Sequence, residues 1–147
     1  MKNMEKIAVS ACLLGVNCKY SGGNNKNEDV LKLAEKFELV PVCPESYGGL
    51  PIPREPSELR GGRVWSKSGK DVTAAFEAGA QKALEKALAN GCRTAVLKER
   101  SPSCGSGKIY DGTFTGTLTD GSGVAAALFA ENGIRVLGES RVGELLR

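Results

Sequence analysis

Short apolar segments alternate with stretches of helical period along this chain, and that alternation limits the possible folds more than any other feature. The apolar segments have the length of strands and lie at residues 7–11, 39–42, 94–97 and 134–137. The periodic stretches predict helices over residues 28–37, 71–88, 124–131 and 139–146. Strands interleaved with such helices are typical of βαβ units that build a parallel sheet. The sequence therefore predicts one α/β domain over residues 1–147, a three-layer Rossmann-like sandwich with a mainly parallel sheet.

Two stretches show neither the apolar runs of strands nor the helical period, and we expect them to be long loop insertions. Residues 44–70 are dense in Gly, Pro and Arg, and residues 101–123 are rich in Ser, Thr and Gly. Within the second stretch, the Asp111-Gly112 pair predicts a two-residue hairpin turn between residues 108–110 and 113–115. Long loops without regular structure are often functional, so both insertions are candidates for the walls or the lid of a site.

Histidine is absent from the chain, and several catalytic mechanisms are excluded with it. A Ser-His-Asp triad, a Cys-His pair and a mixed Cys/His zinc site all need an imidazole. Acid–base chemistry must therefore come from Glu, Asp, Lys, Tyr or Cys side chains.

Charge and hydropathy limit the kinds of partner that the protein can bind and the cell compartment in which we expect it. The net charge is +3 and the Lys and Arg residues are scattered, so we expect no extended nucleic-acid surface. No apolar run approaches the ~20 residues of a membrane span. A signal-peptide h-region is also absent, so we expect a cytoplasmic protein without a membrane anchor. Thiols stay reduced in that compartment, so five cysteines indicate metal binding or reactivity rather than disulfides.

Three of the five cysteines follow predicted strands at matching positions. Cys12 and Cys43 come directly after the first two strands, and Cys104 follows the third after a short polar loop, whereas Cys18 and Cys92 lack this placement. Because the carboxyl ends of parallel strands share one edge, the three thiols are expected to converge on a ligand-binding crevice. Thiolates hold structural zinc and iron–sulfur clusters, and three of them leave one iron of a [4Fe–4S] cluster without a protein ligand. The alternative is that they are ordinary buried core cysteines.

Three separated motifs contain these cysteines. The first is Cys-Leu-Leu-Gly from residue 12, followed by Cys18-Lys19-Tyr20. The second is Pro-Val-Cys-Pro-Glu from residue 41 with Gly-Gly-Leu-Pro-Ile-Pro-Arg from residue 48, and the third is Lys-Glu-Arg-Ser-Pro-Ser-Cys-Gly from residue 98. In this order, and over nearly the whole chain, they resemble the thiouracil desulfidase family.

The resemblance implies a small α/β protein that holds a [4Fe–4S] cluster on Cys12, Cys43 and Cys104. The implied reaction is a non-redox exchange of C=S for C=O in a thiolated uracil, either the base or a nucleotide, with release of sulfide. The implied partner is therefore a small-molecule thiopyrimidine.

Residues of the same motifs are candidates for catalysis and substrate binding. By the resemblance, Glu45 and Ser101 match the family's proposed acid–base and positioning residues. Ser103, Arg54 and Lys98 are expected to contact the substrate. Hydrolysis of a thiocarbonyl needs a thiophile for sulfur, a base for water and donors for the tetrahedral intermediate. Iron, Glu45 and Ser101 with loop N–H groups would supply them.

Other interpretations stay open at this point. A sensor or scaffold that binds a cluster without turnover would not need the two catalytic candidates. A nucleotide-binding α/β module without metal would leave the three thiols unexplained. Arg54, Arg60 and Arg63 would bind phosphate if the substrate is a thiolated nucleotide, and otherwise they form a solvated face.

Overall fold

A four-stranded parallel sheet forms the centre of the structure, a computed structural model that describes residues 4–146. The strands are β1 (Lys6–Ser10), β2 (Glu38–Val42), β5 (Thr94–Leu97) and β8 (Arg135–Gly138), in the order β2-β1-β5-β8. Every neighbouring pair is parallel, so the C-terminal ends of the strands lie along one edge. The predicted α/β fold with a parallel sheet is confirmed.

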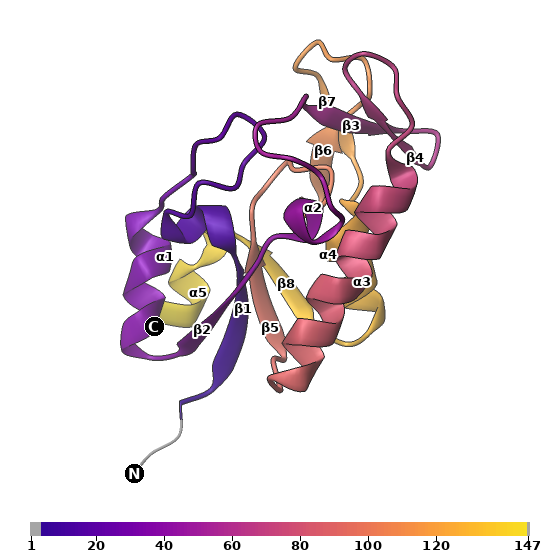
Figure 1. The fold of residues 1–147 in the computed structure, drawn as a ribbon. Helices are drawn as coiled ribbons and strands as arrows, with labels where there is room; N and C mark the ends of the chain where they lie inside the picture. The colour runs from indigo at the N-terminus through magenta and orange to yellow at the C-terminus, as the bar shows by residue number, and fades with distance from the viewer. Residues whose placement is uncertain (1–3, 147) are drawn as a thin grey trace.

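Helices cover both faces of this sheet (Figure 1). One face packs against α3 (Thr73–Ala89) and α4 (Val124–Glu131), and the other packs against α1 (Glu28–Lys32) and α5 (Gly143–Leu146). The start of α1 is fixed by Asn27, whose side chain accepts the Val30 N–H at 3.1 Å and so satisfies a backbone donor at the helix terminus. The three layers predicted from the sequence are therefore present.

The core consists of two apolar clusters, one on each face of the sheet. Successive strand residues point to opposite faces, so Ala8 packs with Phe129 on one side while Ile7 and Val9 pack with Val30 on the other. All five residues are fully buried. Burial of each large side chain contributes roughly 1.5–3 kcal/mol, which holds the helices on the sheet.

Two predicted helices are broken in the structure. The helix predicted over residues 28–37 consists of α1 followed by a 3-10 turn, η2 (Leu33–Glu35). The helix predicted over residues 139–146 is divided into a 3-10 turn, η3 (Glu139–Arg141), and α5. Glycine starts α5, and its high conformational entropy disfavours a continuous helix at that point.

The insertion at residues 44–70 is not irregular as predicted. It contains α2 (Pro44–Tyr47) and an antiparallel hairpin of β3 (Ser57–Arg60) and β4 (Arg63–Ser66). Close packing of α2 on α3 depends on Gly79, because a Cβ there would lie 1.8 Å from the Pro44 carbonyl oxygen. This contact sets the position of the chain directly after β2, where site residues lie.

The two-residue hairpin predicted at Asp111-Gly112 is wrong. The strands that pair are β6 (Lys108–Tyr110) and β7 (Leu118–Asp120), with residues 111–117 as the loop between them. The buried Glu58 carboxylate accepts the Gly112 and Phe114 N–H groups at 3.0 and 3.1 Å and draws this loop onto β3. A tertiary contact therefore overrides the local turn preference.

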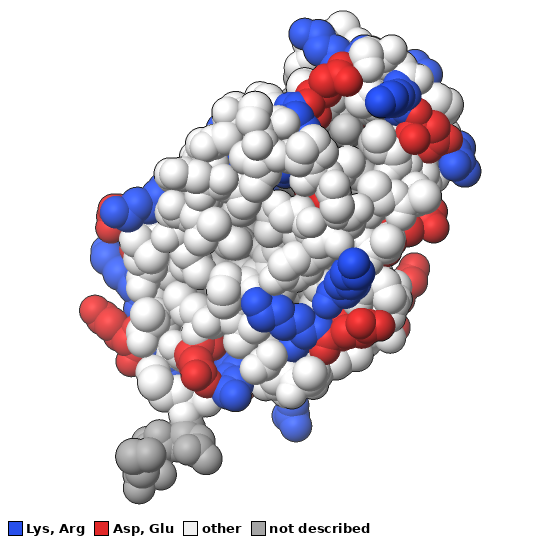
Figure 2. All heavy atoms as spheres, viewed as in Figure 1, with Lys and Arg blue, Asp and Glu red and all other residues white. Residues whose placement is uncertain are grey.

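Charged side chains of both signs are interspersed on the surface. On the face in Figure 2, Lys and Arg lie beside Asp and Glu around a broad uncharged area. None of the helices in the described part of the chain is long and apolar enough to cross a membrane.

Candidate functional site

A cavity of about 330 Å³ lies at the C-terminal edge of the parallel sheet. Ser10 and Val42, the last residues of β1 and β2, contribute to its wall. Arg60 and Arg63, the other candidates for a phosphate, do not line it. The eight residues expected to bind the cluster, catalyse the reaction or contact the substrate do line it: Cys12, Cys43, Cys104, Glu45, Ser101, Ser103, Arg54 and Lys98. The parallel topology thus gathers side chains from three distant segments around one space.

Cys12 lies in η1 (Ala11–Leu14), the 3-10 turn that follows β1. This turn ends at Gly15, whose φ of +95° is in the left-handed region that glycine adopts without strain. The chain then returns past the thiol, so that Asn25 Nδ2 donates to Cys12 Sγ at 3.4 Å and the Asn25 N–H donates to Cys12 O at 2.9 Å. Burial raises the pKa of the Cys12 thiol, and the Asn25 hydrogen bond opposes this shift.

Cys43 lies between β2 and α2, in contact with a second thiol. A hydrogen bond with Cys18 lowers the pKa of Cys43 to about 6, and contacts with Ser46 and Arg54 act in the same direction against burial. Ser46 Oγ lies 3.3 Å from Cys43 Sγ. The same contact and burial raise the pKa of Cys18. Cys43 is therefore the thiol best prepared to bind metal, since the thiolate is the ligand.

Cys104 is the most enclosed of the three thiols. Burial raises the pKa of the Cys104 thiol to about 12, while hydrogen bonds with Ser10 and Ser103 act in the opposite direction. Ser103 Oγ is 3.7 Å from Cys104 Sγ. A coordinating metal deprotonates such a thiol outright, so burial does not prevent it from serving as a ligand.

The possible metal ligands of this cavity are free thiols, the residue type that holds iron–sulfur clusters. All five cysteines are free. Among the described residues, no three His, Cys, Asp or Glu side chains are placed to hold one metal ion. A cluster carries its iron atoms at separate corners, so its cysteine ligands do not have to converge on one point. Cys12, Cys43 and Cys104 around one cavity therefore match the chemistry of a [4Fe–4S] group.

The Glu45 carboxylate is held at both of its oxygens. Arg54 Nε donates to Oε1 at 3.1 Å, and Ser103 Oγ donates to Oε2 at 2.9 Å. Arg54 is itself fixed, because its terminal nitrogens donate to the carbonyl oxygens of Cys18 and Pro51 at 2.9 and 3.1 Å. Its side chain is only 7% exposed. Arg54 therefore orients Glu45 and ties three segments of the cavity wall together, and its contact with substrate stays a prediction.

Ser101 is placed by backbone donors at the start of the Cys104 loop. Its Oγ accepts the N–H groups of Ser103 and Cys104 at 3.1 and 3.0 Å and lies 3.0 Å from Ser103 Oγ. The loop is tight at Gly105, where a Cβ would lie 2.8 Å from the Ser101 carbonyl oxygen. This turn holds the two serine hydroxyls and the cysteine thiol on one side of the cavity.

Lys98 places a positive charge in the cavity wall directly after β5. Its N–H donates to Ser10 Oγ at 2.9 Å, and its ammonium is 2.8 Å from the Glu139 carboxylate. The ammonium charge lowers the pKa of Cys12, and the Glu139 charge raises it. With its side chain 28% exposed, Lys98 remains accessible from the cavity.

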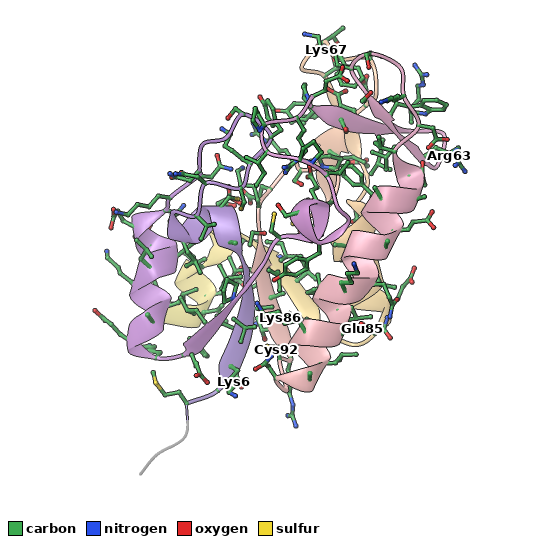
Figure 3. All side chains as sticks on the ribbon, in the orientation of Figure 1. Lys6, Arg63, Lys67, Glu85, Lys86 and Cys92 are labelled. Carbon is green, nitrogen blue, oxygen red and sulfur yellow. The ribbon has the colours of Figure 1, made fainter. Side chains whose placement is uncertain are left out.

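Cys18 lacks the strand-end position of the three predicted ligands, yet it also lies in the cavity wall. It is buried and lies against Cys43. Its occurrence in the same motif as Cys12 was the only sequence signal for this position. Cys92 differs, because it is buried in the core with Ala87 and Ile134 at the other end of the sheet, near Lys6 (Figure 3).

Comparison with known families identifies the group to which this site belongs. A model of the 2-thiouracil desulfurase family matches residues 7–141. The chain belongs to this family. The matched range begins in β1 and ends in η3, so it includes every cavity residue named above.

Individual relatives of this family match along nearly the full length. YbbK of Bacillus subtilis (strain 168), an uncharacterized protein, is 42% identical over 150 residues, covering 95% of this chain and 99% of YbbK. The solved structure of TudS, a [4Fe–4S]-dependent thiouracil desulfidase, has a TM-score of 0.91 at 46% identity and covers 97% of this chain and 95% of TudS. The α/β sandwich is therefore the fold that the chain shares with TudS.

Proposed function

We propose that this protein is a [4Fe–4S]-dependent thiouracil desulfidase that converts a thiolated uracil to the uracil and releases sulfide. The observation that carries the proposal is one cavity with four free thiols, the three proposed ligands among them, and a fixed carboxylate on its wall. The family and its TudS member have this activity in their names. We place the reaction in the cytoplasm, because free cysteines persist in a reducing compartment.

In this proposal Cys12, Cys43 and Cys104 hold the cluster. When bound, the cluster supplies a thiophilic Lewis acid for the sulfur of the substrate. The thiolate form of Cys43 at neutral pH follows from its lowered pKa. Cys18 supports Cys43 through its hydrogen bond rather than acting as a ligand.

Glu45 and Ser101 handle the protons and the orientation of the reacting carbon. Each oxygen of Glu45 keeps lone-pair capacity beyond its contact with Arg54 or Ser103, so the carboxylate can still accept a proton from water. Ser101, fixed by two backbone N–H groups and in contact with Ser103, holds the Cys104 loop beside this base and so shapes the wall against which the pyrimidine lies. Lys98 adds a positive charge for the oxygen that develops negative charge.

A second cavity of about 310 Å³ bears on the choice between base and nucleotide. It shares Tyr20, Glu45 and Tyr110 with the first and is lined by Lys67 on the β3–β4 side. We place the pyrimidine in the first cavity. The second offers space for a ribose, and its wall contains the cation Lys67 together with the carboxylates Glu45 and Glu58. The free base and the nucleotide therefore both stay candidate substrates of the proposed reaction.

Anaerobic reconstitution with iron and sulfide tests the proposal. The reconstituted protein should release sulfide from at least one of 2-thiouracil, 4-thiouracil and 4-thiouridine monophosphate. The ratio of the kcat/KM values for the nucleotide and the free bases decides which of them is the substrate. A cluster that forms without turnover of any of the three would contradict the proposal and support a sensor or scaffold instead.

A further inference from the structure

Ser103 connects the two candidate catalytic residues. Its hydroxyl lies 2.9 Å from Glu45 Oε2 and 3.0 Å from Ser101 Oγ. Its side chain is in a residue only 2% exposed, so these neighbours are fixed rather than exchanged with solvent. We infer that Ser103 is a positioning residue, which holds Glu45 and Ser101 in one arrangement for the reaction. This inference rests on the proposed desulfidase function.

The number of protons available sets the direction of these hydrogen bonds. A carboxylate only accepts, so Ser103 donates its single hydroxyl proton to Glu45. At the contact between the two serines, Ser103 then accepts and Ser101 donates. Ser101 Oγ itself accepts the N–H groups of Ser103 and Cys104. The result is a directed chain from Ser101 through Ser103 to Glu45.

Removal of the Ser103 hydroxyl would release both of its neighbours. Glu45 would keep Arg54 on Oε1 but lose its donor on Oε2, and would be free to rotate about the remaining contact. Ser101 would lose the acceptor for its proton. A hydrogen bond to a charged group is worth enough to change a rate by roughly ten- to a hundredfold, so kcat should fall on that scale.

Two other roles for Ser103 lead to different measurements. A direct contact with substrate, which the sequence interpretation predicted, would raise KM when the hydroxyl is removed. A hydrogen bond to Cys104 Sγ would change the visible spectrum of the cluster, since such bonds tune cluster electronics. The geometry favours Glu45 over this sulfur, because the hydroxyl is 2.9 Å from the carboxylate and 3.7 Å from the thiol.

The first test compares Ser103→Ala with Ser106→Ala in the reconstituted protein. Ser106 lies in the same segment and makes no side-chain hydrogen bond within the described residues. We expect Ser103→Ala to lower kcat about ten- to a hundredfold, with KM, iron and sulfide content and the visible spectrum unchanged. Ser106→Ala should match the wild type, and Ser103→Thr, which restores the hydroxyl, should recover turnover. A raised KM at constant kcat, or an altered spectrum, would overturn the inference.

The second test is a double-mutant cycle between Ser103→Ala and Glu45→Gln. If Ser103 acts through Glu45, the double variant should be no slower than Glu45→Gln alone, and the losses in kcat should not multiply. The same four proteins are also compared by the unfolding midpoint of the apoprotein, which measures the coupling between Ser103 and Glu45 without any turnover. This second measurement tests the inference even if Ser103→Ala fails to hold the cluster. Multiplying losses and additive midpoint shifts would overturn the inference. An inactive wild-type protein with non-additive midpoint shifts would instead contradict only the desulfidase function.

Discussion

At the residue scale, Glu45 carries the clearest prediction about chemistry. Glu45→Gln keeps the shape of the side chain but removes the base, so desulfuration should fall by roughly two to four orders of magnitude. The iron and sulfide content should stay at the wild-type value, because Glu45 is not a ligand in the proposal. Glu77→Gln on the exposed side of α3 is the matched control. Near-normal turnover by Glu45→Gln would remove this carboxylate from the mechanism.

The cysteines divide into those that face the cavity edge and one in the core. Cys104→Ser, like the same change at Cys12 or Cys43, should abolish most of the broad visible absorbance of the reconstituted protein. Cys92→Ser should retain it, since Cys92 is buried at the opposite end of the sheet. Cys18→Ser should also retain it. Measured iron per chain distinguishes these outcomes, and full iron occupancy in Cys104→Ser would contradict the ligand assignment.

The apoprotein should show unequal reactivity of its thiols with pH. The pKa of Cys43 is lowered to about 6, so its thiolate fraction rises through that pH and is nearly complete at neutral pH. The pKa of Cys12 is raised by burial, so Cys12 stays protonated there. Brief alkylation with iodoacetamide at pH 7 should modify Cys43 before Cys12, as read by peptide mass spectrometry. Prior modification of Cys12 would contradict this order.

At the scale of elements, the contact between α2 and α3 controls the position of Cys43 and Glu45. Gly79→Ala would place a Cβ 1.8 Å from the Pro44 carbonyl oxygen, so α2 must move away. We expect a loss of roughly 1–3 kcal/mol in the free energy of unfolding, the usual cost of overpacking, together with lower cluster occupancy. Gly143→Ala is the control, because a Cβ there meets no atom within 4 Å. Equal midpoints in urea for both variants would contradict the role of this contact.

At the scale of the whole molecule, cluster binding should stabilise the folded protein. The cluster would link three segments that, without it, are connected only through the sheet. Its proposed ligands follow β1, β2 and β5, so binding is possible only when all three segments are in place. A ligand at a hundred times its Kd adds about 2.7 kcal/mol to stability. For a domain of this size that corresponds to a rise in Tm of roughly 5–10 °C over the apoprotein. Calorimetry under anaerobic conditions measures it, and an equal rise in Cys104→Ser would contradict it.

The cysteines show which positions a local sequence pattern can predict and which it cannot. The core strands are short apolar runs that can be recognised in the sequence. Cys12 and Cys43 directly follow two of these runs, so the sequence predicts that both lie at the edge of the sheet. The parallel topology then follows from the interleaved helices. The position of Cys18 does not follow from local pattern. It lies in a loop that Arg54 holds through a hydrogen bond to the Cys18 carbonyl oxygen, a contact between segments distant in sequence.

The sequence by itself determined the sheet, the helices α3 and α4 and the set of chemically distinctive residues, since periodicity and residue type are local properties. The tertiary structure alone decided how those residues interact. The directed contacts among Ser101, Ser103 and Glu45 join α2 to the loop after β5, two segments that no short-range pattern links. In the same way, Glu58 overrides the turn preference of residues 111–117, because a buried carboxylate must find donors wherever the fold supplies them.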